Sequence, residues 1–317
     1  EALKNDEQII LFQNRRGFSP YMECEQCGWI PECKHCDVSL TYHRRSNHLI
    51  CHYCGYSVRV PQTCPACGSQ QIVTRGFGTE KVEDEIPLFL PDARVKRMDL
   101  DSTRSRNAYE NIIASFENHE IDILVGTQMV SKGLDFDNVS VVGILNADNM
   151  LNFPDFRAFE RSYQLMAQVS GRAGRKKKQG RVIIQTSQPG HNIIKNVLNN
   201  DFYGMYQSQL RERKEFMYPP YYRLVKILLK HRKRDVLNEA SDLLKKTLQK
   251  TFGYRVLGPQ DPLIGRVQNY HLKHVIIKIE KEKSLNKSKE IIRNITSRVQ
   301  KSDKFKSLQV HYDVDPL

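Results

Sequence analysis

The sequence predicts an α/β protein that carries a Cys-rich insertion and ends in a ferredoxin-like α+β domain. Short apolar strands alternate with helices between about residues 74 and 205, as in a parallel sheet covered on both faces. All eight cysteines fall in four Cys-x-x-Cys pairs, confined to residues 24–67. After the string FMYPPYYR the order becomes β-α-β-β-α-β, which is typical of a ferredoxin-like domain.

The elements of the α/β part can be placed in order. Residues 8–12 (QIILF) read as a buried strand, and residues 78–80 (GTE) begin an amphipathic helix for which Thr79 is the expected N-cap. Further strands are expected at 93–98, 121–125, 139–145 and 181–185, and helices at 108–117 and 158–169. Loops at the carboxyl ends of such strands are where ligands bind.

The remaining elements complete three domains. A helical connector is expected near 191–215, strands at 222–230, 254–258, 271–279 and 307–313, and helices at 235–250 and 285–300. The predicted boundaries are 1–21 with 74–205 for the α/β domain, 22–73 for the insertion and 206–317 for the C-terminal domain.

Charge and composition restrict the class of protein. The net charge of +13 and the pI near 9.3 favour a polyanionic partner, with nucleic acid ahead of an acidic membrane surface; a lysine-rich proteome is the plain alternative. The sequence has no secretory signal and no apolar run near 18 residues, so we expect a cytoplasmic protein with no membrane partner. The chain opens at Glu1 with a helical tail (EALKND), which suggests a fragment of a longer protein.

The cysteine pairs predict two structural zinc sites. A tetrahedral zinc takes four thiolates, and in a reducing compartment such pairs favour metal over disulfides or thioredoxin-like redox chemistry. Nested pairing is favoured, and alternating, cross-braced pairs are the alternative. His35, His43, His48 and His52 are within reach, but eight thiolates already close two sites. The nested sites are Cys33, Cys36, Cys51 and Cys54 for one zinc, and Cys24, Cys27, Cys64 and Cys67 for the other.

Two strings carry the remaining chemistry, VGTQMVSKGLDFD at 125–137 and QVSGRAGR at 168–175. In the second, Arg172 and Arg175 lie three apart at a helix end, and Gly171 and Gly174 allow close backbone approach. Guanidinium groups match phosphate oxygens and can neutralise charge that develops on a γ-phosphate. The plain alternative is an exposed basic loop, which Lys176–Lys178 extend.

Together these strings carry a resemblance. GTQMVSKGLDF resembles motif V and QVSGRAGR motif VI of superfamily-two helicases, both in the second RecA-like lobe. With the four Cys-x-x-Cys pairs, GTE, PDFRA.ER and the C-terminal domain, the whole chain is similar to the PriA family of bacterial primosomal replication-restart helicases (primosomal protein N′).

The resemblance implies roles residue by residue. Motif VI supplies the catalytic Gln168, Arg172 and Arg175. Gly133 and Asp135 face the nucleotide, although Asp135 could be a plain turn residue, and Asp148 and Arg157 could be purely structural. Thr127, Gln128, Lys132 and Thr79 lie at the DNA, Thr79 through the start of its helix.

The resemblance also implies a function for the longer protein. That function is ATP- and Mg²⁺-dependent 3′-to-5′ unwinding that recognises stalled forks and loads the primosome. The implied partners of this monomer are branched fork DNA, single-stranded DNA, single-stranded DNA-binding protein and primosome loading proteins, at the bacterial nucleoid. The sequence has no G-x-x-x-x-G-K-[ST] and no acidic DE-x-[DH] motif, so the chain alone should not hydrolyse ATP.

Two further sets of residues admit two interpretations each. In the insertion, Trp29, Tyr42, Tyr53 and Tyr56 alternate with Arg44, Arg45 and Arg59, which suits base stacking, yet Trp29 could fill the module's core. The basic residues of the C-terminal domain could contact DNA or form a solvated face; they are Lys226, Lys230, Arg232, Lys233, Arg234, Arg266, His271, Lys273 and His274. The competing functions are a non-catalytic zinc-ribbon scaffold and a zinc hydrolase, which closed all-cysteine sites disfavour.

Overall fold

A computed structural model describes residues 1–13, 21–43, 46–75, 78–100, 102–103, 105–131, 136–174 and 179–316. The chain divides into two compact units, the first made of residues 1–20 and 76–209 and the second of residues 21–75 and 210–317. Among the helices described, none has the length and apolar character needed to cross a membrane.

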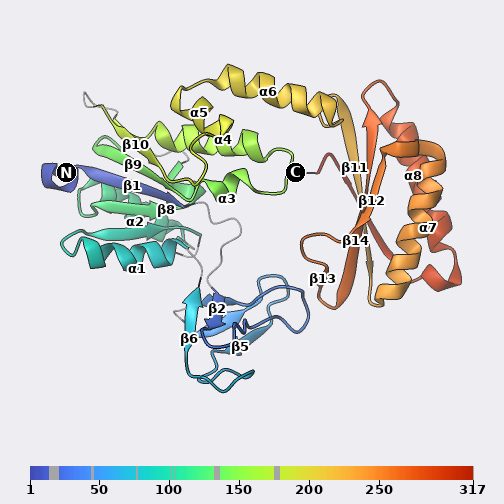
Figure 1. The fold of residues 1–317 in the computed structure, drawn as a ribbon, viewed down its shortest axis with the longest axis horizontal. Helices are drawn as coiled ribbons and strands as arrows, with labels where there is room; N and C mark the ends of the chain where they lie inside the picture. The colour runs from blue at the N-terminus through green and yellow to red at the C-terminus, as the bar shows by residue number, and fades with distance from the viewer. Residues whose placement is uncertain are drawn as a thin grey trace. The chain divides into compact units, whose positions relative to one another are not determined.

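A five-stranded parallel sheet forms the centre of the first unit (Figure 1). Its strand order is β10-β9-β1-β8-β7, with β1 paired on its two sides to β8 and β9. The expected α/β fold with a parallel sheet is therefore confirmed. The strands are β1 (Gln8–Gln13), β7 (Val95–Met98), β8 (Ile123–Gly126), β9 (Val139–Leu145) and β10 (Arg181–Ile184).

Helices cover both faces of this sheet because its strands are apolar on both sides. From β1, Ile10 and Phe12 pack into the larger cluster with Phe116 and Met166, whereas Ile9 and Leu11 meet Val82 on the other face. The connector predicted as one helical segment is two helices, α5 and α6. The helices are α1 (Thr79–Phe89), α2 (Arg106–Glu117), α3 (Asp148–Leu151), α4 (Ala158–Ser170), α5 (Asn192–Leu198) and α6 (Phe202–Glu215).

The start of α1 differs from the prediction. Gly78, not Thr79, is the N-cap, with extended backbone and no side-chain capping bond. Thr79 is the first helical residue, and its hydroxyl donates instead to Oδ2 of buried Asp99 over 2.6 Å. A hydrogen bond to a buried carboxylate is stronger than a neutral capping bond, which explains why the hydroxyl turns inward.

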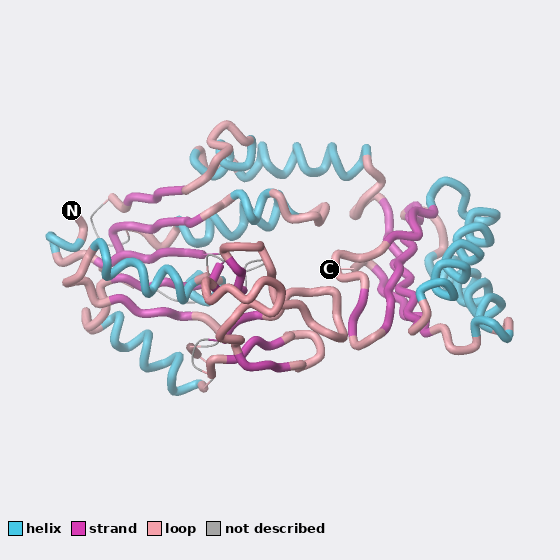
Figure 2. The backbone as a smooth tube through the Cα atoms, turned by 60° about the horizontal axis from the view of Figure 1, so that its bottom comes forward, coloured by secondary structure: helices cyan, strands magenta, loops and turns pink. Residues whose placement is uncertain are grey.

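In the second unit, the C-terminal domain is a five-stranded antiparallel sheet, four long strands and the short β13, with two helices side by side on one face (Figure 2). The order β12-β14-β11-β15 follows from β-α-β-β-α-β connectivity, so the ferredoxin-like prediction agrees with the structure. A two-residue strand, β13, was not predicted and pairs with the start of β14. The elements are β11 (Tyr222–His231), α7 (Arg234–Phe252), β12 (Val256–Gln260), β13 (Arg266–Val267), β14 (Tyr270–Glu280), α8 (Leu285–Gln300) and β15 (Gln309–Val314).

In the described residues of the Cys-rich module, the regular structure consists of short strands. β2 pairs with β6 where the module begins and ends, and β3, β4 and β5 form a three-stranded sheet. Its core is small and includes Cys33, Cys36 and Cys51, as expected where metal supplements a hydrophobic core. The strands are β2 (Tyr21–Cys24), β3 (Thr41–His43), β4 (His48–Ile50), β5 (Ser57–Arg59) and β6 (Ile72–Arg75). Short 3-10 turns are η1 (Leu3–Asn5), where a helical tail was expected, η2 (Gln128–Ser131), η3 (Gly253–Arg255) and η4 (Asp303–Phe305).

Candidate functional site

The structure groups the eight cysteines as nested pairs. Within each group the Sγ atoms all lie within 4.8 Å of one another, and every cysteine is a free thiol. The Sγ atoms of Cys24 and Cys67 are 3.6 Å apart and those of Cys33 and Cys54 3.5 Å. Thiolates about 2.3 Å from a tetrahedral ion lie about 3.8 Å apart, so the two four-cysteine clusters are compatible with two structural zinc ions. The groups are Cys24, Cys27, Cys64 and Cys67, and Cys33, Cys36, Cys51 and Cys54.

Each Cys-x-x-Cys pair forms a knuckle that the backbone closes. The amide of the first cysteine donates to the carbonyl five residues on, as from Cys24 to Trp29 and from Cys33 to Val38. In three knuckles a glycine with positive φ follows the second cysteine and donates its amide back to the first one; these are Gly28, Gly55 and Gly68. Glycine suits this position because the left-handed conformation strains other residues.

The fourth knuckle, Cys33–Cys36, is built differently. Asp37 stands where the other knuckles have glycine, and its amide donates over 3.0 Å to the carbonyl of Arg266 in the C-terminal domain. Burial raises the pKa of Cys36 to about 12, and the amide of Gln268, 3.3 Å from its Sγ, opposes that effect. A buried thiolate at this position therefore needs a cation, which fits a metal ligand.

The aromatic residues of the module divide into two sets. Tyr42 and Tyr56 pack against its core, and the ring of Tyr56 meets His35 edge to face. Tyr53 is half exposed, whereas Trp29, like Tyr42 and Tyr56, is only partly exposed, so Tyr53 is the most accessible of the four rings. Arg59 is also exposed, and Arg44 and Arg45 lie outside the described residues.

The histidines do not join the cysteine groups. His43 and His52 instead face each other, with their Nε2 atoms 3.1 Å apart, and His48 bonds through Nδ1 to the carbonyl of Ser46. His35 meets Asn269 of the C-terminal domain, with Nδ1 3.2 Å from the amide nitrogen of that side chain.

Motif V begins at the carboxyl end of β8. Thr127 follows the strand, and Gln128 opens the 3-10 turn η2. Gly126 is required here because a Cβ atom at that position would collide with Cγ1 of Val130 and lie 2.9 Å from the carbonyl oxygen of Met98. The tight turn therefore fixes Thr127 and Gln128, while Lys132, Gly133 and Asp135 lie outside the described residues.

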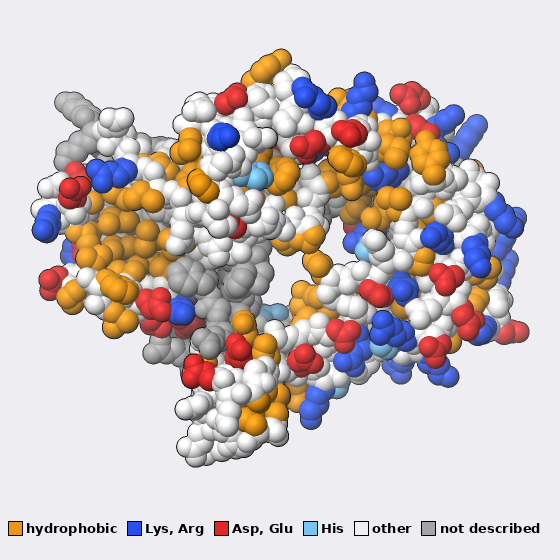
Figure 3. Space-filling view, in the orientation of Figure 1, with side chains coloured by type: hydrophobic (Ala, Val, Ile, Leu, Met, Phe, Trp, Pro, Cys, Tyr) orange, Lys and Arg blue, Asp and Glu red, His pale blue; other side chains and the backbone are white. Residues whose placement is uncertain are grey.

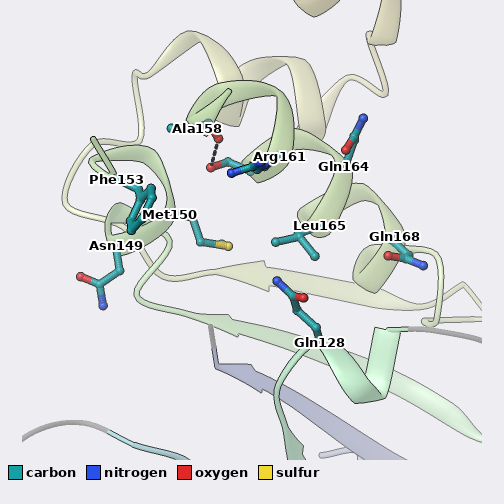
Figure 4. A pocket seen from close by; sticks show the side chains of 10 residues that line it. Gln128, Asn149, Met150, Phe153, Ala158, Arg161, Gln164, Leu165 and Gln168 are labelled. Atoms are coloured by element: carbon teal, nitrogen blue, oxygen red, sulfur yellow. Dashed lines mark hydrogen bonds between the residues drawn. The ribbon is translucent and has the colours of Figure 1, made fainter. Parts of the chain in front are cut away.

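Gln128 and Gln168 line the same pocket. The pocket has a volume of about 280 Å³ and lies between η2 and the helices α3 and α4. Gln128 reaches towards the helix that carries Gln168, with Leu165 between them (Figure 4). Arg161 is held at the wall by an ion pair of 2.8 Å with Asp155. The other lining residues are Asn149, Met150, Phe153, Ala158, Ser162 and Gln164.

Motif VI runs from this pocket to the other end of the sheet. Gln168 is exposed near the end of α4, and Gly171 caps the helix. The amide of Gly174 then donates over 2.9 Å to the carbonyl of Val139, the first residue of β9. Arg172, partly buried, therefore lies towards the amino end of β9 rather than at a carboxyl edge, and Arg175 with Lys176–Lys178 lies outside the described residues.

Asp148 is engaged in local structure. Its carboxylate accepts hydrogen bonds from the hydroxyl of Thr186 and from the amide and hydroxyl of Ser187, at 2.5 to 2.8 Å. Burial alone would raise the pKa of Asp148, but these bonds outweigh it and hold the pKa below its usual value. Arg157 lies over the ring of Phe156, 4.2 Å from its centre. Both arrangements agree with the structural interpretation of the two residues.

Several basic residues of the C-terminal domain are paired. Arg266 bonds to Asp37 of the module, and Lys273 lies 3.3 Å from Asp261. Figure 3 shows Lys and Arg interspersed with Asp and Glu over this domain, as on a solvated face. The contact of Arg266 with Asp37 was not predicted, because the two residues lie 229 positions apart in the sequence.

Comparisons with known proteins find family models that match separate segments of the chain and relatives that match all or most of it. Three family models match: "PriA DNA helicase Cys-rich region (CRR) domain" at residues 33–59, "Helicase conserved C-terminal domain" at 72–177 and "Primosomal protein N C-terminal domain" at 214–317. The replication restart protein PriA of Bacillus subtilis is 40% identical over 100% of this chain and 39% of its own length. The replication restart protein PriA of Borreliella burgdorferi is 36% identical over 94% of this chain and 46% of its own length. That of Synechocystis is 37% identical over 100% of this chain and 38% of its own length.

The chain thus spans about two fifths of the length of the curated relatives it matches. The solved helicase domain of Pyrococcus furiosus Hef is a distant likeness, 18% identical over 58% of this chain and 22% of that one, with a TM-score of 0.26.

Proposed function

The chain belongs to the PriA family of replication restart proteins, and on this premise we propose that it is the C-terminal part of an ATP-dependent 3′-to-5′ DNA helicase. The longer protein would recognise stalled or abandoned replication forks and load the primosome. Residues 1–21 and 74–205 would be its second motor lobe, 22–73 its zinc module and 206–317 its C-terminal DNA-contacting domain.

One observation carries this proposal: the predicted motif V and motif VI residues Gln128 and Gln168 line one pocket on one lobe. A motor must link the state of its nucleotide to its grip on DNA. Here η2, which follows the strand that ends in Gly126, and α4, which leads into the arginines, pack against the same core. A shift of α4 would therefore reach the motif V turn through side chains in contact.

The proposed nucleotide chemistry needs a second lobe. Mg²⁺-ATP supplies the phosphoryl group that is transferred to water. Arg172 and Arg175 would neutralise charge on the phosphates, Gln168 would sense the nucleotide state, and Gly133 and Asp135 would face the ribose. The sequence has no G-x-x-x-x-G-K-[ST] phosphate cradle, so in this proposal the chain alone binds no ATP productively.

DNA would meet the lobe through Thr127, Gln128 and Lys132 and through the start of α1. Because the Thr79 hydroxyl is bonded to Asp99, the backbone amides of the first turn of α1, rather than this hydroxyl, would receive a phosphate there. We further propose single-stranded DNA-binding protein and primosome loading proteins as partners, a monomeric state and a place at the bacterial nucleoid, in the cytoplasm.

The test compares DNA-stimulated ATPase in the full-length gene product and in this chain, on branched forks and on plain duplex. Fork-stimulated turnover in the full-length protein and none in the chain would support the motor. Fork binding without turnover in the full-length protein would instead support the alternative function, a non-catalytic zinc-ribbon scaffold.

A further inference from the structure

The Cys33–Cys36 knuckle is the one of the four that lacks the amide bond back to the carbonyl of its first cysteine. In the other three, a glycine amide returns to the first cysteine of the pair. Here the corresponding amide, that of Asp37, bonds to the carbonyl of Arg266, 229 residues along the chain. A carbonyl of the C-terminal domain thus takes the place of the local cysteine carbonyl that accepts this amide in the other knuckles.

A hairpin of the C-terminal domain makes this contact. β13 and the start of β14 pair at Arg266–His271 and Val267–Tyr270, and the two turn residues Gln268 and Asn269 both have positive φ, 51° and 64°. Two consecutive positive φ values define the type I′ turn that suits the twist of a two-residue hairpin. The tip is therefore a rigid element whose amides have fixed directions.

The backbone amides of the tip point at the knuckle. The amide of Gln268 donates to Sγ of Cys36 over 3.3 Å, and the amide of Asn269 donates to the carbonyl of His35 over 2.9 Å. Together with the bond from Asp37 to Arg266, three hydrogen bonds donated by backbone amides join the two segments. One of them ends on an atom that would hold the metal.

Side chains strengthen the same contact. Arg266 donates through Nε to Oδ1 of Asp37 over 2.8 Å and through Nη1 to the carbonyl of Lys34 over 3.3 Å. Val267 packs against the core cluster of the module. The contact is thus apolar at Val267, charged at Arg266 and directed by backbone bonds at the tip, which is the make-up of a specific interface.

We propose that the C-terminal domain completes the Cys33/Cys36/Cys51/Cys54 metal site: the 266–271 hairpin positions the ligand Cys36, so metal retention at this site and docking of the hairpin depend on each other. The dependence is reciprocal because a metal that orders the knuckle also orders the carbonyls of Lys34 and His35 and the amide of Asp37 that the hairpin binds. The other site, Cys24/Cys27/Cys64/Cys67, has glycines after both of its knuckles and no contact of this kind among the described residues, so the two sites differ.

The first experiment measures zinc release from the complete 317-residue chain into excess chelator, followed with a chromophoric indicator. Arg266→Ala should speed the release of one of the two zinc equivalents about tenfold and leave the other unchanged, as is typical when a group that supports a ligand is removed. Arg234→Ala is the matched control, because Arg234 also pairs with an aspartate, Asp261, of the same domain. Unchanged release, or equal acceleration of both equivalents, would overturn the proposal.

A spectroscopic measurement assigns the site directly. In the chain loaded with ¹¹³Cd, the amide proton of Gln268 should show a scalar coupling to one of the two cadmium signals, transmitted through Sγ of Cys36. If the amide proton coupled to neither cadmium signal, the hydrogen bond from Gln268 to Cys36 would be absent and the inference would be wrong.

The reverse dependence is tested by hydrogen exchange at the hairpin amides. Cys54→Ser, which removes a ligand of the hairpin-contacting site, should raise exchange at Gln268 and Asn269 at least tenfold. Cys67→Ser, which removes a ligand of the other site, should leave both amides protected. These amides belong to the C-terminal domain, so the readout survives even if a variant module unfolds. Equal exchange in the two variants would contradict the proposed dependence.

Discussion

The hydroxyl of Thr79 donates a hydrogen bond to Oδ2 of Asp99 over 2.6 Å, and both residues are almost completely buried. Oδ1 of the same carboxylate accepts the amide of Ser102, and Nε of Arg97 lies 3.6 Å from Oδ2. The first turn of α1 is thus fastened to the end of β7 by a charged group inside the protein.

Replacement of that hydroxyl should cost stability rather than DNA affinity. Thr79→Val removes the hydroxyl donor from a buried carboxylate that keeps the Ser102 amide and the nearby Arg97, so we expect the free energy of unfolding to fall by about 1.5–3 kcal/mol. Thr79→Ser keeps the hydroxyl and should lose less. Urea denaturation measures the stability, and titration with single-stranded DNA measures binding. Weaker DNA binding by Thr79→Val at unchanged stability would contradict this prediction and give the hydroxyl a DNA contact.

Arg172 should be required for hydrolysis in the full-length protein. Arg172→Ala removes a cation that is proposed to meet the phosphates, so DNA-stimulated ATPase should fall about 10³-fold or more while fork binding changes little. Arg106→Ala is the control, since Arg106 is an exposed arginine of α2 that pairs with Glu110. Activity retained in Arg172→Ala, or lost equally in Arg106→Ala, would exclude a role for Arg172 at the phosphates.

Zinc content should follow the two cysteine groups. The chain should bind two equivalents, and Cys51→Ser should bind one, because one tetrahedral site loses a thiolate. Elemental analysis after gel filtration gives the number directly. In the full-length protein the same variant should lose unwinding more than ATPase. Two equivalents in Cys51→Ser would show that this residue is not a ligand.

Asp148 should stabilise the fold in a pH-dependent way. The pKa of Asp148 is lowered in the folded protein. Its contribution to the free energy of unfolding is therefore complete above the unfolded-state pKa of 3.8 and is lost as pH falls through the lower folded-state pKa. Asp148→Asn cannot accept all three bonds from Thr186 and Ser187. The stability gap between wild type and this variant should be full at pH 7 and narrow below about pH 3.8, measured by chemical denaturation. A gap that does not change with pH would contradict the assignment.

The motif V turn should not tolerate a side chain at Gly126. In Gly126→Ala the new methyl group would meet Val130 and the carbonyl of Met98, which overpacks the turn and should lower stability by about 1–3 kcal/mol. Adding Val130→Ala should recover part of the loss but not all, because the Met98 carbonyl stays 2.9 Å away. A fully stable Gly126→Ala variant would show that the turn is looser than described.

Local patterns predicted most elements of the fold. The alternation of apolar strands and helices predicted the sheet from β1 to β10, and β-α-β-β-α-β predicted the C-terminal domain. The cap of α1 was misplaced because the tertiary partner of Thr79, Asp99, is twenty positions away and invisible to local rules. For the same reason no local pattern indicated that Arg266 meets Asp37, a contact between segments more than two hundred residues apart.

The sequence predicted the grouping of the cysteines but not the pocket that Gln128 and Gln168 share. Cysteine spacing predicted nested groups, since each knuckle is a local turn and only the pairing of knuckles is long-range. The motif strings named Gln128 and Gln168, but their shared pocket depends on how α4 packs over the sheet, which no spacing rule specifies. The roles of Lys132, Gly133, Asp135 and Arg175 stay predictions, because these residues lie outside the described part of the chain.

The pairing of β2 with β6 has a consequence for how such proteins change over evolution. Tyr21 and Arg75 are partners in that ladder, so the Cys-rich module enters and leaves through neighbouring backbone positions roughly 5 Å apart. A hairpin turn can span the same gap. The backbone geometry at this point is therefore compatible with a shorter connection in place of the module, although such a change would also remove the partners of the C-terminal hairpin at Asp37 and Cys36.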